Sequence, residues 1–131
     1  MIMDKDTHMA DIIYTTTVHT IGAEAKTFAE EGMAVLFGEE APPELREYCY
    51  LVERSALRGR IQPGAVMVIG TERLPITAVG QVAEKNLADL GHVTINGDAA
   101  TVAKLEGTVH VRSADGTLPE ILEGTQIRIE A

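Results

Sequence analysis

Short segments of alternating apolar and polar residues, each ended by turn residues, recur along this chain and constrain its fold more than any other feature. HVTIN (92–96) and GTVHVR (107–112) alternate residue by residue, and the β-branched run IIYTTTVHTI (12–21) stops at Gly22. Successive side chains of a strand point to opposite faces, so these segments predict half-buried strands. Further strands are predicted at 34–38, 48–52 and 125–130, with two more inside 59–80.

Two or three short helices are predicted between the strands. The clearest is VAEKNLADL (82–90), which gathers its apolar residues on one face and is followed by Gly91, the residue type suited to a left-handed helix end. A second helix is predicted within 23–33 and a third near Pro43. Seven or eight short strands with so few helices indicate a mainly β barrel or sandwich.

Composition limits the classes of partner. The chain has 131 residues, and its 20 acidic against 11 basic residues give a formal charge of -9. Nucleic acids and anionic membrane surfaces favour basic proteins, so neither is an expected partner. No apolar run approaches the roughly 20 residues that span a bilayer. We expect residues 1–8 to be a disordered leader or an added extension and residues 9–131 to form one domain.

Cysteine and histidine are the residue types of this chain that are most informative about catalysis and metal binding. Cys49 is the only cysteine, which excludes an internal disulfide and is consistent with a reducing cytoplasm. We interpret it as a small buried apolar residue. His19, His92 and His110 show no metal-ligand spacing, so no metal and no cofactor are predicted, although a zinc site built from all three is an alternative.

Strand alternation places His92 and His110 on the polar faces of their strands. Val93 and Ile95 point the opposite way from His92, as Val109 and Val111 do from His110. If the two strands pair, the histidines could approach each other across the ladder. The alternative is that each is a solvent-facing or hydrogen-bonded strand histidine without a chemical role.

Two parts of the chain show a weak sequence similarity, or internal echo. IQPGAVMVI (61–69) and ILEGTQIRI (121–129) share an isoleucine, a glycine three residues later and a closing β run. A turn followed by a strand recurs often by chance, so a duplication is one reading among others.

Several segments together resemble a known family. ITAVGQVAEKNLADLGHVT (76–94) is the most specific, and IIYTTTVHTIG, EEAPPELREYCYL, IQPG and GTVHV follow the same order over nearly all of residues 11–131. They are similar to the glucitol/sorbitol-specific IIA component of the bacterial phosphoenolpyruvate-dependent sugar phosphotransferase system. The resemblance implies a closed or nearly closed β-barrel of short strands with short helices.

The resemblance also implies a role and partners. Such a IIA component accepts a phosphoryl group from the phosphocarrier HPr on a histidine and passes it to a cysteine of the IIB component during sugar uptake. Imidazole suits this role because a neutral ring nitrogen is nucleophilic. The protein would be cytoplasmic, would reach the membrane only through the transporter complex, and would have HPr and IIB-type proteins as partners. We also expect self-association, such as a homodimer, through exposed strand edges.

One departure from the family pattern concerns the phosphoryl acceptor itself. The acceptor is expected in a segment resembling hydrophobic-His-x-x-Gly-Glu-Leu, which here reads YLVERSAL (50–57). Val52 occupies the histidine position, and valine cannot accept a phosphoryl group. His92, in the best-matching segment, is therefore the predicted catalytic residue, with a structural role at the helix-to-strand junction as its alternative. A IIA-like interaction or regulatory module that cannot be phosphorylated is the alternative function.

Overall fold

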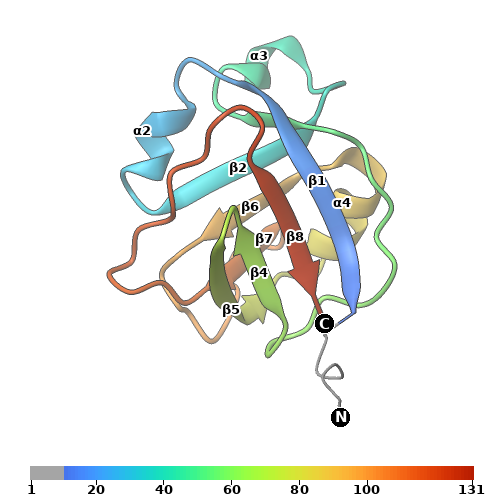
Figure 1. The fold of residues 1–131 in the computed structure, drawn as a ribbon, viewed down its shortest axis with the longest axis vertical. Helices are drawn as coiled ribbons and strands as arrows, with labels where there is room; N and C mark the ends of the chain where they lie inside the picture. Colours follow the sequence, from blue (N-terminus) through green and yellow to red (C-terminus); the bar gives the residue numbers. More distant parts are fainter. Residues whose placement is uncertain (1–10) are drawn as a thin grey trace.

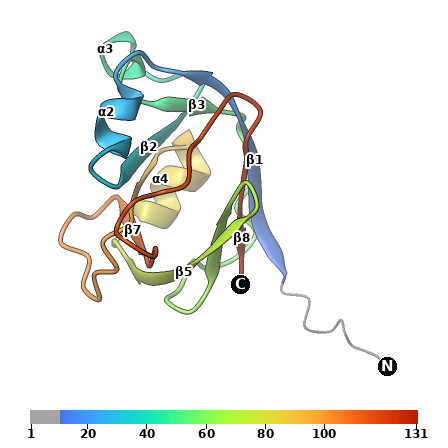
Figure 2. The ribbon, with the colours of Figure 1, turned by 60° about the vertical axis from the view of Figure 1, so that its left-hand side comes forward.

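The structure, a computed structural model, describes residues 11–131, and the expected leader (residues 1–8) lies outside them. The described chain forms a closed barrel of eight strands with three short helices around it (Figures 1 and 2). The prediction of a mainly β fold with a closed barrel and short helices is therefore confirmed. None of the helices in residues 11–131 is long and apolar enough to cross a membrane.

The predicted elements are present with small changes at their ends. The helices are α2 (Ala25–Ala29), α3 (Pro43–Arg46) and α4 (Ala83–Leu90). The strands are β1 (Ile12–Ile21), β2 (Met33–Gly38), β3 (Tyr50–Val52), β4 (Val66–Ile69), β5 (Glu72–Val79), β6 (Val93–Asn96), β7 (Thr108–Val111) and β8 (Gln126–Glu130). Around the barrel they run β1-β3-β2-β6-β7-β5-β4-β8. Because each of these strands has two neighbours, the described barrel offers no open strand edge for the self-association expected above.

The order of strands divides the barrel into two similar halves. The first half contains β1, α2, β2, α3, β3 and β4, and the second contains β5, α4, β6, β7 and β8, so only α3 has no counterpart among the described elements. In each half the first strand pairs antiparallel with the third, with an irregularity in the register, and the second pairs parallel with the third. The halves meet through four antiparallel pairs: β2 with β6 and β4 with β8, each of which joins equivalent strands, and β1 with β8 and β4 with β5, which are equivalent to each other. This arrangement is that of a pseudo-twofold axis.

The register of the strands assigns each residue of one half its counterpart in the other. Leu51 pairs with Phe37 and Thr20, while His110 pairs with Asn96 and Ala78 at the equivalent places. His110 is therefore the counterpart of Leu51, and Asn96 that of Phe37. The echoing segments 61–69 and 121–129 end in β4 and β8, which pair with each other. The echo thus marks equivalent places in the two halves.

Two glycines repeat at equivalent positions because the chain passes too close to itself for a side chain. A Cβ at Gly22 would lie 2.3 Å from the carbonyl oxygen of Arg46, and one at Gly80 would lie 2.2 Å from that of Glu106. Both glycine amides donate hydrogen bonds to the start of the third strand of their half, at 2.9 and 2.8 Å. The same packing constraint thus acts twice in one chain.

The interior of the barrel holds the main apolar core. Val93, Ile95, Val109 and Val111 point inward and are buried, as the alternation of their segments predicts. A second, smaller apolar cluster lies apart from it, where the segment after β2 covers β2 and β3. It consists of Phe37, Ala41, Cys49 and Leu51, with Val35 packed against it.

Candidate functional site

The position at which the family resemblance places the acceptor histidine lies in the interior of the barrel. Val52 is the last residue of β3, is 0% exposed and belongs to the main core. It pairs with Gly38 on one side and Val18 on the other. An aliphatic side chain in this place can only pack, so the expected acceptor has no chemical substitute at its own position.

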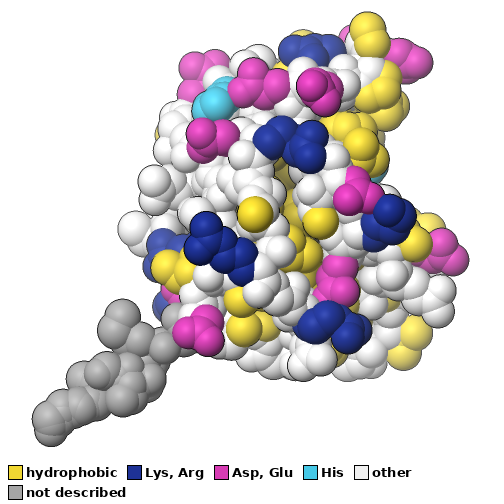
Figure 3. Space-filling model, turned by 90° about the vertical axis from the view of Figure 1, so that its right-hand side faces the viewer, with side chains coloured by type: hydrophobic (Ala, Val, Ile, Leu, Met, Phe, Trp, Pro, Cys, Tyr) yellow, Lys and Arg dark blue, Asp and Glu magenta, His cyan; other side chains and the backbone are white. Residues whose placement is uncertain are grey.

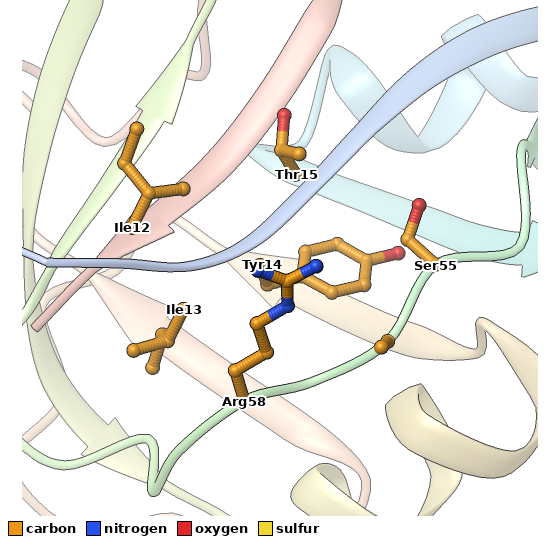
Figure 4. Close-up of a pocket in the computed structure, with 7 residues that line it drawn as sticks. Ile12, Ile13, Tyr14, Thr15, Ser55 and Arg58 are labelled. Atoms are coloured by element: carbon orange, nitrogen blue, oxygen red, sulfur yellow. The ribbon is translucent and has the colours of Figure 1, made fainter.

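The residues that follow Val52 form one wall of a cavity beside β1. The amide of Glu53 donates to Thr17 (3.0 Å) and the amide of Arg58 donates to Ile13 (2.8 Å), which ties the segment to β1 at both ends. Between these bonds lies a cavity of about 300 Å³, in which β1 and the segment face each other (Figure 4). Its lining is Ile12, Ile13, Tyr14, Thr15, Ser55, Ala56 and Arg58.

This cavity combines apolar surface with a few polar groups. The Tyr14 hydroxyl is buried and has no hydrogen-bond partner within residues 11–131, and Arg58 and Ser55 face the same space (Figure 4). The face of the molecule turned toward the viewer in Figure 3 carries a strip of hydrophobic surface with Lys and Arg side chains on either side. A hydroxyl and a guanidinium are donors, so the cavity can receive an acceptor group.

His92 sits where α4 ends and β6 begins, and its imidazole is held in one orientation. Gly91 adopts the left-handed conformation (φ 69°) that terminates α4. The His92 Nδ1 lies 3.1 Å from the carbonyl oxygen of Leu36, and the ring stacks on Phe37 with 4.2 Å between centroids. A carbonyl oxygen can only accept, so Nδ1 carries the hydrogen and the neutral ring leaves its Nε2 lone pair free.

Arg54 joins the segment after Val52 to the turn that carries His92. Its side chain runs across two glycines: a Cβ would meet the Arg54 Cδ at 2.7 Å on Gly38 and 3.5 Å on Gly91. Its guanidinium lies 3.5 Å from the Ala88 carbonyl oxygen, near the end of α4. A helix C-terminus carries a partial negative charge, so it attracts the Arg54 guanidinium to the turn that carries His92. The two most informative family segments therefore meet in space.

His110 is not near His92, so the conjecture that the two histidines approach each other is wrong. β6 and β7 do pair, but in parallel and in a register that sets His110 opposite Asn96, four positions along β6 from His92. His110 is 6% exposed, and its Nδ1 lies 2.7 Å from Asp98 Oδ1. It is a hydrogen-bonded strand histidine as the alternative reading predicts, but it is buried.

The remaining candidate residues, His19 and Cys49, do not form a site together. His19 contacts Glu39 on the exposed end of β1. Cys49 is 2% exposed, and burial raises the pKa of its thiol, which fits the interpretation as a small apolar residue. In the part of the chain that the structure describes, no three His, Cys, Asp or Glu side chains are grouped to hold a metal ion.

Sequence reasoning missed three residues that shape these sites. Arg54, Tyr14 and Asp98 approach their partners from distant segments, and nothing in the local sequence around Tyr14 or Asp98 indicates the contact. A signal for Arg54 existed in its position within the family segment, next to Glu53.

The architecture and the sequence both have close matches among known proteins. A crystal structure of a PTS system IIA component from Enterococcus faecalis V583 matches with a TM-score of 0.74 and 26% identity, over 90% of this chain and 100% of that one. The barrel is thus that of a phosphotransferase-system IIA component. A family model described as "PTS system glucitol/sorbitol-specific IIA component" matches residues 13–128, so this chain belongs to that family.

Two curated relatives agree with the family. They are the "PTS system glucitol/sorbitol-specific EIIA component" of Shigella flexneri and that of Escherichia coli strain K12. Each is 41% identical over 121 residues, which cover 92% of this chain and 96% of the relative. The resemblance stated from the sequence is therefore confirmed over almost the whole chain.

Proposed function

We propose that this protein is a phosphocarrier of a glucitol/sorbitol phosphotransferase system and that His92 is its phosphoryl acceptor. The observation that carries the proposal is the hydrogen bond from His92 Nδ1 to the Leu36 carbonyl oxygen, at 3.1 Å. It fixes the tautomer in which Nε2 has the lone pair, and His92 is only partly buried. His92 also lies beside the family's acceptor segment through Arg54.

The transfer would proceed by in-line displacement. The bond between phosphorus and the ring nitrogen of phospho-HPr breaks as the bond between phosphorus and His92 Nε2 forms, while the hydrogen stays on Nδ1 and is donated to the Leu36 carbonyl oxygen. The ring gains positive charge in this step, and the C-terminus of α4 stabilises it. The Arg54 guanidinium lies beside this turn and would stabilise the phosphoryl oxygens. The thiolate of a IIB cysteine would then attack the phosphorus, forming a bond between sulfur and phosphorus as the bond to His92 Nε2 breaks.

A second function has an observation of its own. Val52 is completely buried at the expected acceptor position, and Ser55, Ala56 and Leu57 stand where the family pattern has Gly-Glu-Leu. A chain with these changes would keep the IIA surface and bind IIB or another partner without carrying phosphate. In this reading His92 only closes the helix-to-strand junction.

The experiment that separates the two functions is phosphorylation with mass localisation. The protein is mixed with phosphoenolpyruvate, enzyme I and HPr, and its intact mass is measured at neutral pH, where phosphohistidine survives. We expect a gain of one phosphoryl group that is absent in His92→Gln and present in His110→Gln. No gain under conditions that label a IIA relative with an intact acceptor motif would reject the carrier and favour the interaction module.

The partners and location belong to the same proposal. HPr and a IIB-type protein are the expected donor and recipient, in the cytoplasm, with the membrane reached through the transporter. A homodimer stays a prediction, and light scattering at several protein concentrations would test it.

A further inference from the structure

A second cavity lies outside the barrel wall, between β6, β7 and the segment 97–107. Its volume is about 400 Å³. The segment is fastened over the strands by hydrogen bonds from the Ala99 amide to Val111 (3.0 Å) and from the Thr77 hydroxyl to Ala100 (2.6 Å). The polar residues of the lining are Thr94, Asn96, Asp98, Lys104, Thr108 and His110. None of them has a role in the proposed phosphoryl transfer.

The other half of the barrel shows what this place looks like when it serves only for packing. The counterparts of Thr94, Asn96, Thr108 and His110 are Val35, Phe37, Cys49 and Leu51. These apolar residues fill their space and form the second apolar cluster. Where one half is apolar and filled, the other is polar and hollow. Packing alone would not select four polar residues for these positions.

His110 presents an unpaired ring nitrogen at this cavity. The residue is 6% exposed, yet its Nε2 is buried and has no hydrogen-bond partner anywhere in residues 11–131. Its other nitrogen is occupied by Asp98, whose Oδ1 also accepts from the Ala100 amide at 3.1 Å. A buried polar atom without a partner is costly, and a bound molecule would supply the partner.

The charges of the lining indicate the class of that molecule. Partial burial opposes ionisation of Asp98, but the hydrogen bonds from His110 and Ala100 hold its pKa below the ordinary value, so it is a carboxylate. An anion would meet this carboxylate, and a cation would meet Lys104. Hydroxyl groups both donate and accept, and so match Thr94, Thr108, Asn96 and a His110 Nε2 that accepts while Asp98 holds the Nδ1 hydrogen.

One side of the cavity is apolar. Met33 lies on the strand wall, and Val102 and Leu105, which are 68% and 71% exposed, stand in the covering segment. A ligand that set its C–H groups against these residues would remove apolar surface from water. A molecule with hydroxyl groups on one side and hydrocarbon on the other fits both walls.

We propose that the cavity formed by β6, β7 and residues 97–107 binds a small uncharged molecule rich in hydroxyl groups, with His110 Nε2 accepting a hydrogen bond from one of them. Binding needs no phosphoryl donor, so the existence of this site does not depend on whether His92 is phosphorylated. The hydroxyl groups face Thr94, Asn96 and His110, and the hydrocarbon side faces Met33 and Leu105.

Ring-labelled histidine allows the site to be tested directly by nuclear magnetic resonance. The full chain is titrated with three uncharged probes, D-glucitol, glycerol and methyl glucoside, and with two charged ones, inorganic phosphate and methylammonium. We expect a saturable shift of the His110 ring signals with at least one uncharged probe and none at the exposed His19. If none of the three uncharged probes gives a saturable His110 shift, the proposal is overturned. A saturable shift with a charged probe only would also overturn it.

A matched variant comes from the other half of the barrel. Asn96→Phe places in the cavity the side chain that its counterpart Phe37 places in the apolar cluster, and it keeps His110 as the reporter. We expect the saturable shift to disappear while thermal unfolding shows a folded protein. If the fold does not accept the ring, Thr94→Val, which copies the counterpart Val35, removes one hydroxyl and should weaken binding about 3- to 10-fold. Unchanged binding in the folded variants would place the probe elsewhere and overturn the site.

Discussion

The two halves of the barrel share one backbone arrangement but differ in the side chains outside the barrel wall. In the first half, Leu51 and Phe37 fill the space outside the barrel wall with apolar side chains. In the second half, His110 and Asn96 occupy the same places and leave a cavity of about 400 Å³. The strands, pairings and closing glycines are the same. The first half therefore serves as a control for the second. Because the equivalent positions are apolar and packed in the first half, the fold itself does not require them to be polar and hollow in the second.

The same comparison bears on His92. Its counterpart is Met33, the first residue of β2, since Val35 pairs with Thr94 across the pseudo-twofold axis. Met33 lines the cavity beside Asn96, as His92 stacks on Phe37. A flat or flexible side chain therefore satisfies the packing here, and the imidazole adds a ring nitrogen that packing alone does not require.

The largest effect is expected where the two halves are most alike. Gly22→Ala and Gly80→Ala each put a Cβ within 2.3 Å of a backbone carbonyl oxygen, which cannot move as a side chain can. We expect each to lower the free energy of unfolding by about 3 kcal/mol or more. Gly107→Ala is the control, because its Cβ would meet only the Asn86 side chain at 3.8 Å. Chemical denaturation followed by circular dichroism measures all three, and a large difference between the first two would contradict the equivalence of the halves.

The next effect separates the filled half from the hollow one. Leu51→Ala opens a void in the apolar cluster and should cost about 2–3 kcal/mol. His110→Ala enlarges an existing cavity and removes a buried nitrogen that has no partner, so it should cost about 1 kcal/mol. Urea denaturation of both variants gives the comparison. Equal losses would show that His110 is as much a packing residue as Leu51.

A smaller, pH-dependent effect belongs to the hollow half alone. The hydrogen bonds from His110 and Ala100 outweigh desolvation and lower the pKa of Asp98, so they stabilise the fold above the ordinary value of 3.8. This contribution is lost as the pH falls through the lowered folded-state pKa. Asp98 is partly exposed, which limits the contribution to about 1 kcal/mol or less. Unfolding midpoints of the wild type and Asp98→Asn should converge below pH 3.8; a constant gap would assign the loss to something other than ionisation.

The smallest effect on stability is expected from copying the first half into the second at the proposed acceptor. His92→Met reproduces Met33 and keeps an apolar contact with Phe37 but loses the hydrogen bond to the Leu36 carbonyl oxygen, so the free energy of unfolding should fall by only about 0.5 kcal/mol. Phosphorylation by HPr should nevertheless be abolished. Retained labelling of this variant would move the acceptor to another residue, and a large loss of stability would give His92 a structural role.

Much of the fold was predictable because the signals are local. Gly91 ends α4 and β6 begins at Val93, as the glycine and the alternation that follows it indicate. Val93, Ile95, Val109 and Val111 face inward, as their spacing requires. The family segments could also be recognised from the sequence residue by residue, including the valine at the expected acceptor position. Such features depend on nearest neighbours along the chain, where periodicity and backbone preferences act.

The candidate sites depended on contacts that no local pattern records. The sequence by itself determined the strand and helix order, the family and the presence of a valine, Val52, where the family resemblance expects the acceptor. Only the tertiary structure decided that His92 and His110 lie apart, that Arg54 crosses the His92 turn and that His110 is buried against Asp98. The physical reason is register: a parallel pairing of β6 and β7 and the closure of the barrel bring together residues from segments distant in sequence.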